Sequence, residues 1–147
     1  MRVITRQVEN QPLTVIIEYP EYDKSASDLI RKINNLNFRF TAFDEEKQIR
    51  IDLSDVYYIE NVERKMFIYT EKEVYRFNST MSEIEEMIKE TDMVRISRTC
   101  IMNTIHLKEI RQVKNSHLEA VMDNDEMLIV SRKYLRDIKS VFKRGEV

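Results

Sequence analysis

Runs in which apolar and polar residues alternate cover much of the chain, and this period of two predicts β-strands. The clearest alternation lies in residues 38–43 and 48–52, and the acidic residues 44–46 between them are typical of a hairpin loop. A second pair, residues 56–59 and 66–70, is separated by a loop at residues 60–65. Further runs follow at residues 73–77, 93–96, 106–113, 117–122 and 127–130. Short strands spaced this closely indicate an antiparallel meander, so the predicted fold class is mainly β with short helices.

Three segments instead place apolar residues at the spacing of a helix. The first is residues 24–34. Asp23 or Ser25 can act as its N-cap and accept hydrogen bonds from the first turn. Residues 80–83, with the sequence Thr-Met-Ser-Glu, form a capping box before a short helix. Ser131 can cap a final helix, whose apolar side carries Leu135, Ile138, Val141 and Phe142.

Residues 1–44 have the pattern of an added unit. Residues 3–8 alternate, and residues 13–19 form a β-branched run that stops at Pro20, which has no N–H for a strand ladder. With the helix that follows, these runs predict a strand–strand–helix extension. The extension has too few residues for a stable core of its own. We therefore expect it to extend the first sheet or to form a dimer contact through the helix residues Leu29, Ile30, Ile33 and Leu36.

The composition predicts a protein of the cytoplasm with one core. The chain has 147 residues, of which 42% are hydrophobic, and its one Gly and two Pro leave little material for flexible linkers. Cys100 is the one cysteine, which excludes an internal disulfide and suits a reducing compartment. The sequence has no apolar run as long as a membrane span and no signal-peptide core, so the cytoplasm is the expected location.

The residues that usually carry enzyme chemistry do not form a recognisable set. A single glycine cannot build a Gly-rich phosphate loop, and His106 and His117 have no Cys or His neighbour at metal-ligand spacing. Cys100 has no partner base and is expected to pack as a small hydrophobic residue, with redox sensing as the alternative. We therefore predict that the protein is not an enzyme and needs no metal, cofactor or small-molecule substrate.

Charge is distributed unevenly along the chain, although the net charge is −2. Residues 94–147 contain eleven Lys and Arg against seven Asp and Glu, a balance of +4. Residues 1–93 contain thirteen basic and nineteen acidic residues, a balance of −6. One basic end is the electrostatic pattern expected of a DNA-binding protein, although an asymmetry of this size also arises by chance.

Residues 93–103 combine a strand pattern with a polar cluster. Ser97, Arg98 and Thr99 stand together between the alternating residues 93–96 and the apolar pair Ile101-Met102. Hydroxyl groups and a guanidinium can donate to phosphate oxygens, and a guanidinium can also bind a guanine edge through two hydrogen bonds. The segment is therefore a candidate DNA contact. Its other interpretation is a strand end and a turn with a solvated arginine.

Three short motifs, in the same order and at similar distances, resemble those of the LytTR family of bacterial DNA-binding domains. The central sequence R-I-S-R-T-C-I-M-N at residues 95–103 is similar to the family's central signature. Upstream, residues 53–60 (L-S-D-V-Y-Y-I-E) resemble its opening motif, and downstream, residues 129–134 (I-V-S-R-K-Y) resemble its closing motif. The resemblance covers about residues 45–143. We therefore divide the chain into an extension at residues 1–44 and a LytTR-like domain at residues 45–147.

This resemblance implies an elongated arrangement of small antiparallel sheets, with loops from successive sheets facing DNA. It also implies three groups of DNA contacts. The first loop, residues 61–65, offers Arg64 and Lys65, because Met66 stands where some members have histidine. The central motif offers Arg98 as the residue that reads bases, and the position after V-S corresponds to Arg132 or Lys133. The full set of expected contacts is Arg64, Lys65, Arg95, Ser97, Arg98, Thr99, Asn103, Arg132, Lys133 and Arg136.

The leading hypothesis is a sequence-specific transcription regulator that reads major grooves of double-stranded DNA with basic loops. LytTR domains most often follow a phospho-receiver domain, and residues 1–44 contain no receiver pattern, so a standalone member is expected. Small regulators of this kind are often controlled by a partner, frequently a membrane protein. We expect a homodimer at least on DNA, because one small domain offers few base contacts. The alternative hypothesis is an adaptor that binds another protein through an exposed sheet edge.

Overall fold

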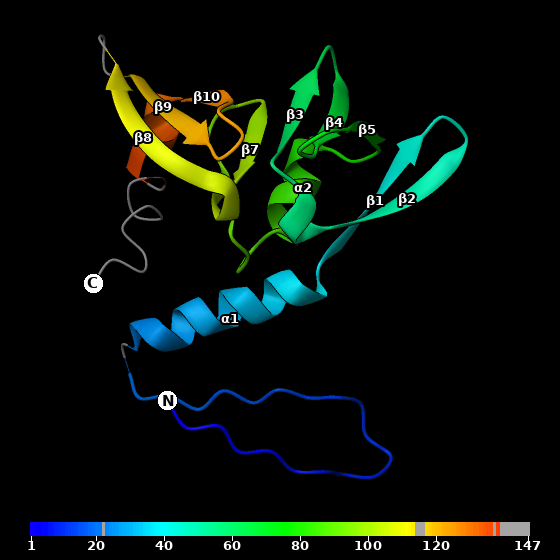
Figure 1. The fold of residues 1–147 in the computed structure, drawn as a ribbon, viewed down its shortest axis with the longest axis vertical. Helices are drawn as coiled ribbons and strands as arrows, with labels where there is room; N and C mark the ends of the chain where they lie inside the picture. Colours follow the sequence, from blue (N-terminus) through cyan, green and yellow to red (C-terminus); the bar gives the residue numbers. More distant parts are fainter. Residues whose placement is uncertain (22, 114–116, 137, 139–147) are drawn as a thin grey trace.

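The computed structural model describes residues 1–21, 23–113, 117–136 and 138, and within them the protein is mostly β (Figure 1). Its strands form one seven-stranded sheet, in the order β2-β1-β5-β4-β3-β7-β6, and one three-stranded sheet, in the order β10-β9-β8. Within each sheet, all the strand pairs of the described residues are antiparallel. The predicted fold class is therefore confirmed.

Most strand predictions are correct to within a few residues. The large sheet contains β1 (Arg39–Asp44), β2 (Lys47–Asp52), β3 (Tyr58–Val62), β4 (Lys65–Tyr69), β5 (Val74–Phe77), β6 (Met93–Arg95) and β7 (Cys100–Asn103). The small sheet contains β8 (Leu107–Val113), β9 (His117–Met122) and β10 (Met127–Val130). The β1–β2 hairpin turns at Glu45, which has a positive φ of 55°. Strand β1 lies in residues 1–44, the expected extension, and pairs with both β2 and β5 of the large sheet.

One face of the large sheet packs against helix α2 (Met81–Met87). Ile59, Ile68 and Ile101, on neighbouring central strands, are fully buried there together with Ile84 of the helix. The Thr80 side chain accepts a hydrogen bond from the backbone N–H of Glu83, as the capping box predicted. The alternation along these strands thus directs every second side chain into a first core.

The opposite face packs against the small sheet and forms a second core. Cys100 and Met102 of β7 contribute to it, whereas Ile101 between them belongs to the first core. Strand β7 is therefore buried on both faces. The sequence analysis did not predict it as a strand, because a strand covered on both faces has a continuous apolar run and no alternation.

A polar junction joins the two sheets at His106. The residue lies in the 3-10 turn η2 (Thr104–His106), outside the strand that the pattern predicted from residue 106. Its ring stacks on Tyr57 with 4.1 Å between centroids, and its nitrogens contact the Ser54 carbonyl at 2.6 Å and the Asp123 carboxylate at 3.2 Å. Hydrogen bonding to Asp123 raises the pKa of Tyr57 to about 12, and the same bond lowers the pKa of Asp123.

Helix α1 (Lys24–Asn37) extends three residues beyond its predicted end and is capped by the Asp23 carboxylate. Polar contacts attach it to the segment before β6. Asp92 accepts from the Arg31 Nε at 3.2 Å and from the Asn35 Nδ2 at 2.6 Å. Asn34 donates to the Glu90 carbonyl at 3.0 Å. The helix is therefore attached to the domain mainly through its polar side, and Leu36 stays 81% exposed.

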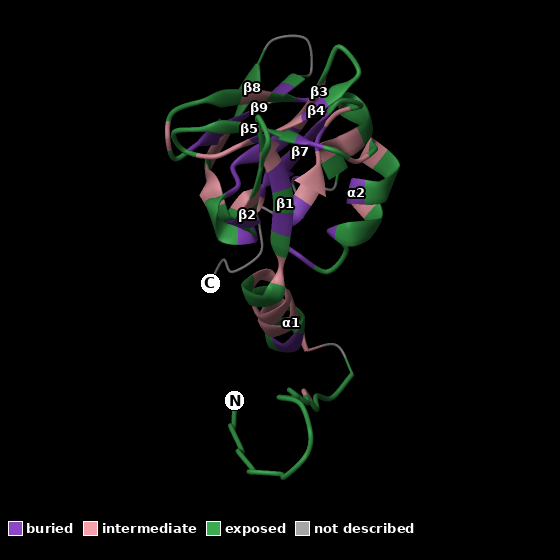
Figure 2. Cartoon of the chain, turned by 90° about the vertical axis from the view of Figure 1, so that its right-hand side faces the viewer, coloured by how far each residue is buried: buried purple, intermediate pink, exposed green. Residues whose placement is uncertain are grey.

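Residues 1–21 contain no strand, so the two strands expected at residues 3–8 and 13–19 are corrected. These residues run as two extended segments on the far side of α1 from the sheets (Figure 1) and are almost all exposed (Figure 2). Neither segment has a neighbouring strand that supplies a hydrogen-bond ladder. At the other terminus, Leu135, Arg136 and Ile138 are helical, while the rest of the predicted final helix and the turn at residues 115–116 lie outside the described residues.

Candidate nucleic-acid interface

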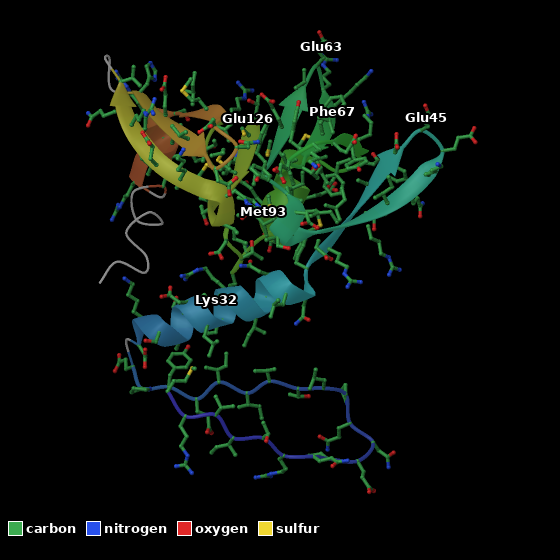
Figure 3. All side chains as sticks on the ribbon, in the orientation of Figure 1. Lys32, Glu45, Glu63, Phe67, Met93 and Glu126 are labelled. Atoms are coloured by element: carbon green, nitrogen blue, oxygen red, sulfur yellow. The ribbon has the colours of Figure 1, made fainter. Side chains whose placement is uncertain are left out.

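The first basic group lies at the tip of the β3–β4 hairpin, where Figure 3 labels Glu63. The two strands meet at a two-residue turn in which Glu63 and Arg64 have φ values of 50° and 67°. Two consecutive positive φ values are those of a type I′ turn. The predicted loop at residues 60–65 is therefore shorter than expected. Arg64 and Lys65 are exposed at this tip, whereas Met66 is 4% exposed in the first core.

The second group is the connection between β6 and β7, which we call the central loop (residues 96–99). Its ends are fixed: Ile96 is fully buried, and its N–H donates to the Cys100 carbonyl at 3.0 Å. Inside the loop, the Thr99 N–H donates to the Ser97 hydroxyl at 3.2 Å. Arg98 is exposed, and its guanidinium makes no hydrogen bond or ion pair with any residue of the described chain. The loop therefore presents Arg98 to solvent from a fixed base.

Arg95 holds this loop in place. Its Nε donates to the Ser97 carbonyl at 3.0 Å, and its Nη2 donates to the Arg98 carbonyl at 2.7 Å. Its Nη1 lies 3.1 Å from the Glu85 carboxylate of α2. With these donors engaged and the side chain only 20% exposed, the geometry makes Arg95 a positioning residue of the loop.

Asn103 has a structural role that its position in the motif did not reveal. The residue is fully buried, and its Nδ2 donates to the carbonyls of Leu53 and Val56 at 2.8 and 2.7 Å. Its Oδ1 accepts from the Ile105 N–H at 3.1 Å. A side chain enclosed and bonded in this way cannot reach DNA. The expected DNA contact of Asn103 is therefore corrected to a structural role.

The third group belongs to the 3-10 turn η3 (Arg132–Tyr134), which follows β10. Ser131 precedes the turn, but its side chain makes no capping bond, contrary to the prediction. The Tyr134 ring lies between two cations: the Lys133 ammonium and the Arg95 guanidinium are each 5.7 Å from its centroid. Arg132, Lys133 and Arg136 are exposed at this turn and in the helical residues after it.

Hydrogen bonds bring the three groups to one end of the molecule. The Asn61 N–H of β3 donates to the Thr99 carbonyl at 2.8 Å, which places the β3–β4 tip beside the central loop. The Ser131 N–H donates to the Ile96 carbonyl at 2.9 Å, which places η3 on the other side of that loop. Sequence reasoning identified the three groups separately, but it could not show that they are neighbours.

The electrostatics of this end favour a polyanion. Arg64, Lys65, Arg98 and Arg136 are exposed and form no ion pair with another residue of the described chain. Of the nearby acids, Glu85 is bound to Arg95, Glu60 lies half-buried on β3 opposite Cys100, and Glu63 remains exposed in the turn. The sequence analysis missed two positioning groups. Tyr134 stood in the closing motif and could have been noticed, whereas Glu85 lies outside all three motifs.

Other kinds of site are not evident in the described residues. No three His, Cys, Asp or Glu side chains among them are arranged to hold a metal ion. Neither described helix is long and apolar enough to span a membrane. Cys100 is 7% exposed in the second core, and this burial raises the pKa of its thiol well above the usual value.

The chain is similar to several bacterial proteins over half to two thirds of its length. It is 26% identical over 95 residues to a sensory transduction protein LytT of Enterococcus faecalis, covering 65% of this chain and 39% of that protein. A LytT of Bacillus subtilis is 26% identical over 96 residues, covering 65% of this chain and 40% of that protein. A transcriptional regulatory protein LytR of Staphylococcus aureus is 29% identical over 73 residues, covering 50% of this chain and 30% of that protein. The chain thus spans about two fifths of the length of the LytT proteins that it matches.

A solved structure and a family model agree with these similarities. The fold matches a LytTr DNA-binding domain from Bacillus cereus with a TM-score of 0.65 and 25% sequence identity, covering 71% of this chain and 95% of that one. The family model described as LytTr DNA-binding domain matches residues 46–143, nearly the range of about 45–143 that the resemblance covers. The chain therefore belongs to the LytTr DNA-binding domain family.

Proposed function

We propose that this protein recognises specific sequences in double-stranded DNA and thereby regulates transcription. The observation that carries the proposal is the meeting of three basic groups, distant in the sequence, around the central loop. Four of their cations, Arg64, Lys65, Arg98 and Arg136, are exposed and form no ion pair within the described chain, as a phosphate-binding surface requires. The family supports DNA as the ligand, and the LytT and LytR relatives support a regulatory role.

The three groups have different tasks in this proposal. Arg98 reads a base edge in the major groove, because its loop is anchored on both sides and its fork can form two parallel hydrogen bonds with guanine. Ser97 and Thr99 donate to phosphates beside it. Arg64 and Lys65 contact the backbone on one side of the loop, and Arg132, Lys133 and Arg136 do so on the other. Such phosphate contacts set the register of the protein on the duplex.

The alternative function, an adaptor that binds through a sheet edge, has less support. The strand β2 forms one edge of the large sheet, and Lys47, Arg50 and Asp52 are exposed along it. Charged residues on an edge strand discourage the addition of another strand. An adaptor edge would instead be long and apolar.

A selection from random duplex DNA tests the proposal directly. We expect the bound fraction to become enriched in one motif, whereas a pool that stays random would contradict sequence recognition. Affinity for the selected duplex should fall steeply with salt, because each phosphate contact contributes about −0.9 to the slope of log K against log salt concentration. A flat salt titration would contradict DNA binding through the basic groups.

Two substitutions separate base reading from phosphate binding. Arg98→Ala should cost about 1–3 kcal/mol of binding energy on the selected duplex and relax the preference at one or two base positions. Because Arg98 is exposed, the free energy of unfolding should change by less than about 0.5 kcal/mol. Arg136→Ala is the matched control, which should weaken binding to all duplexes alike and reduce the salt slope by about one unit. If Arg98→Ala also weakens all duplexes equally, base reading must lie at Lys133 or at the Arg64–Lys65 tip.

The cellular location and the partners that we propose are suggested by the family, and no contact within the chain bears on them. We propose that the protein acts in the cytoplasm, binds DNA as a homodimer and answers to a controlling partner, for which a membrane protein is the first candidate. Co-purification of tagged full-length chain with membrane fractions, compared between the wild type and a variant lacking affinity for DNA, tests the last point. Absence of the chain from those fractions in both cases would contradict it.

A further inference from the structure

The apolar side chains of residues 1–21, which we call the N-terminal arm, are exposed to an unusual degree. Leu13 is 99% exposed, Ile16 80%, Val3 75% and Ile4 72%. The arm has no strand, and a turn at residues 9–10 separates its two segments. Within the second segment, the Thr14 hydroxyl donates to the Pro12 carbonyl at 3.0 Å. Figure 2 shows the arm almost entirely in the colour of exposed residues.

This exposure conflicts with the residue types in the arm. Residues 3–8 alternate apolar and polar side chains, and residues 13–19 are rich in β-branched residues, as in strands that bury one face. Two strands alone are only marginally stable in water, because they have no third strand or helix to cover the apolar face. A large exposed apolar patch on a soluble domain marks an interaction site.

From this conflict we propose that the arms of two copies pair with each other as antiparallel strands and form a homodimer. The charges of the arm are self-complementary. Its first segment carries Arg2, Arg6 and Glu9, with a balance of +1, whereas its second segment carries Glu18 and Glu21, with a balance of −2. When Arg6 of one copy lies opposite Glu18 of the other, the two-fold axis repeats the pair, so opposite charges face each other at both symmetry-related positions. This is the isologous arrangement that a two-fold dimer requires.

The area available in the arm is sufficient for such a dimer. Its exposed large apolar residues are Met1, Val3, Ile4, Val8, Leu13, Val15, Ile16 and Tyr19. Burial of one aliphatic side chain removes roughly 60–120 Å² from water, so complete burial of all eight would remove roughly 500–900 Å² per copy as an upper limit. A stable interface of standard size buries about 800 Å² per partner.

The position of the arm is compatible with DNA binding. In both Figure 1 and Figure 2 the arm lies at the opposite end of the molecule from the tip of β3 and β4. Asp92 attaches α1, the helix after the arm, to the segment that leads into β6. A dimer formed through the arms therefore leaves both candidate interfaces uncovered, and it forms without DNA.

Sedimentation equilibrium of the full chain without DNA tests the pairing. We expect a concentration-dependent dimer for the wild type and a monomer for the double variant Ile4→Asp/Ile16→Asp. The matched control is Leu36→Asp, which puts a charge at an equally exposed apolar position outside the arm and should leave the dimer intact. A wild type that stays monomeric, or a dimer that survives the double substitution, overturns the proposal. Circular dichroism checks the fold, which these exposed positions should not affect.

A charge reversal tests the register of the pairing. Arg6→Glu should weaken the dimer about tenfold or more, and addition of Glu18→Arg to the same chain should restore most of the lost affinity. If Arg6→Glu has no effect, the opposite charges do not face each other and the proposed arrangement is wrong. Because both experiments are done without DNA, their failure is distinguishable from a failure of sequence-specific DNA binding, which the random-duplex selection measures.

Discussion

Replacement of Arg95 tests whether the central loop is held by the protein before it meets DNA. Arg95 donates to the carbonyls of Ser97 and Arg98 and pairs with Glu85, and its guanidinium lies over Tyr134. Arg95→Ala removes all four contacts and leaves Arg98, the proposed base reader, unchanged. Arg95→Lys keeps the positive charge but lacks the planar fork that reaches two carbonyls at once.

The expected magnitudes follow from these contacts. Two charge-assisted hydrogen bonds at a partly exposed site contribute about 1.5–3 kcal/mol together, and the contact with Tyr134 about 0.5–1 kcal/mol. Glu85 is 41% exposed, so its ion pair with Arg95 contributes little. We therefore expect a loss of about 2–4 kcal/mol in the free energy of unfolding. Ordering of one released loop residue on DNA costs about 1–2 kcal/mol, which weakens binding about tenfold.

Urea denaturation and duplex-binding titrations at several salt concentrations measure both effects. If Arg95 positions the loop, Arg95→Lys should lose nearly as much stability and affinity as Arg95→Ala, and the salt slope should stay unchanged in both variants. If Arg95 contacts phosphate, Arg95→Lys should bind almost as well as the wild type. In that case Arg95→Ala should reduce the slope by about 0.9 with little loss of stability, and this result would refute the positioning role.

Three further predictions concern the domain itself. Asn103→Ala should lower the free energy of unfolding in urea by about 2–4 kcal/mol, because it removes the side-chain donor from the carbonyls of Leu53 and Val56 at a fully buried position. Asp123 has a lowered pKa in the folded protein, so its carboxylate stabilises the fold above about pH 4 and this contribution is lost as the pH falls through the folded pKa. The difference in stability between the wild type and Asp123→Asn should therefore shrink in acid, and a constant difference from pH 7 to pH 3 would contradict this. Cys100 should react slowly with a thiol reagent at pH 8 in the native protein and rapidly in urea, because burial disfavours its thiolate.

The sequence predicted those parts of the fold in which one face of an element is buried. The strands β1 and β2 alternate clearly, because one face packs on the first core and the other meets solvent. Strand β7 was missed because both of its faces are covered, by α2 and by the small sheet. The opposite error was made in the arm, where strand-like residues form no strand. The hydrophobic pattern of a segment shows only that it is compatible with a strand. Whether the strand forms also depends on a second strand that pairs with it, which the pattern of the segment does not show.

The candidate site was predictable in composition but not in arrangement. Arg64, Arg98 and Arg136 were expected at the surface, and all three are exposed. Their proximity depends on two long-range backbone hydrogen bonds, from Asn61 to Thr99 and from Ser131 to Ile96. Backbone bonds of this kind involve no particular side chain, so no residue type in the sequence indicates them.

The central motif contains two kinds of residue that sequence resemblance cannot separate. Asn103 is enclosed and ties β7 to the backbone near Leu53, while Arg95 ties the central loop to α2. Both residues can affect the proposed DNA contacts of the loop without touching DNA. The buried residues Ile96 and Cys100 fix the two ends of the loop in the second core, so Arg98 projects from a base whose height is set by packing. Base reading demands such precision, because a guanidinium displaced by about 1 Å can no longer form two parallel hydrogen bonds with guanine. The proposed base reading by Arg98 therefore depends on the buried apolar residues of the motif as well.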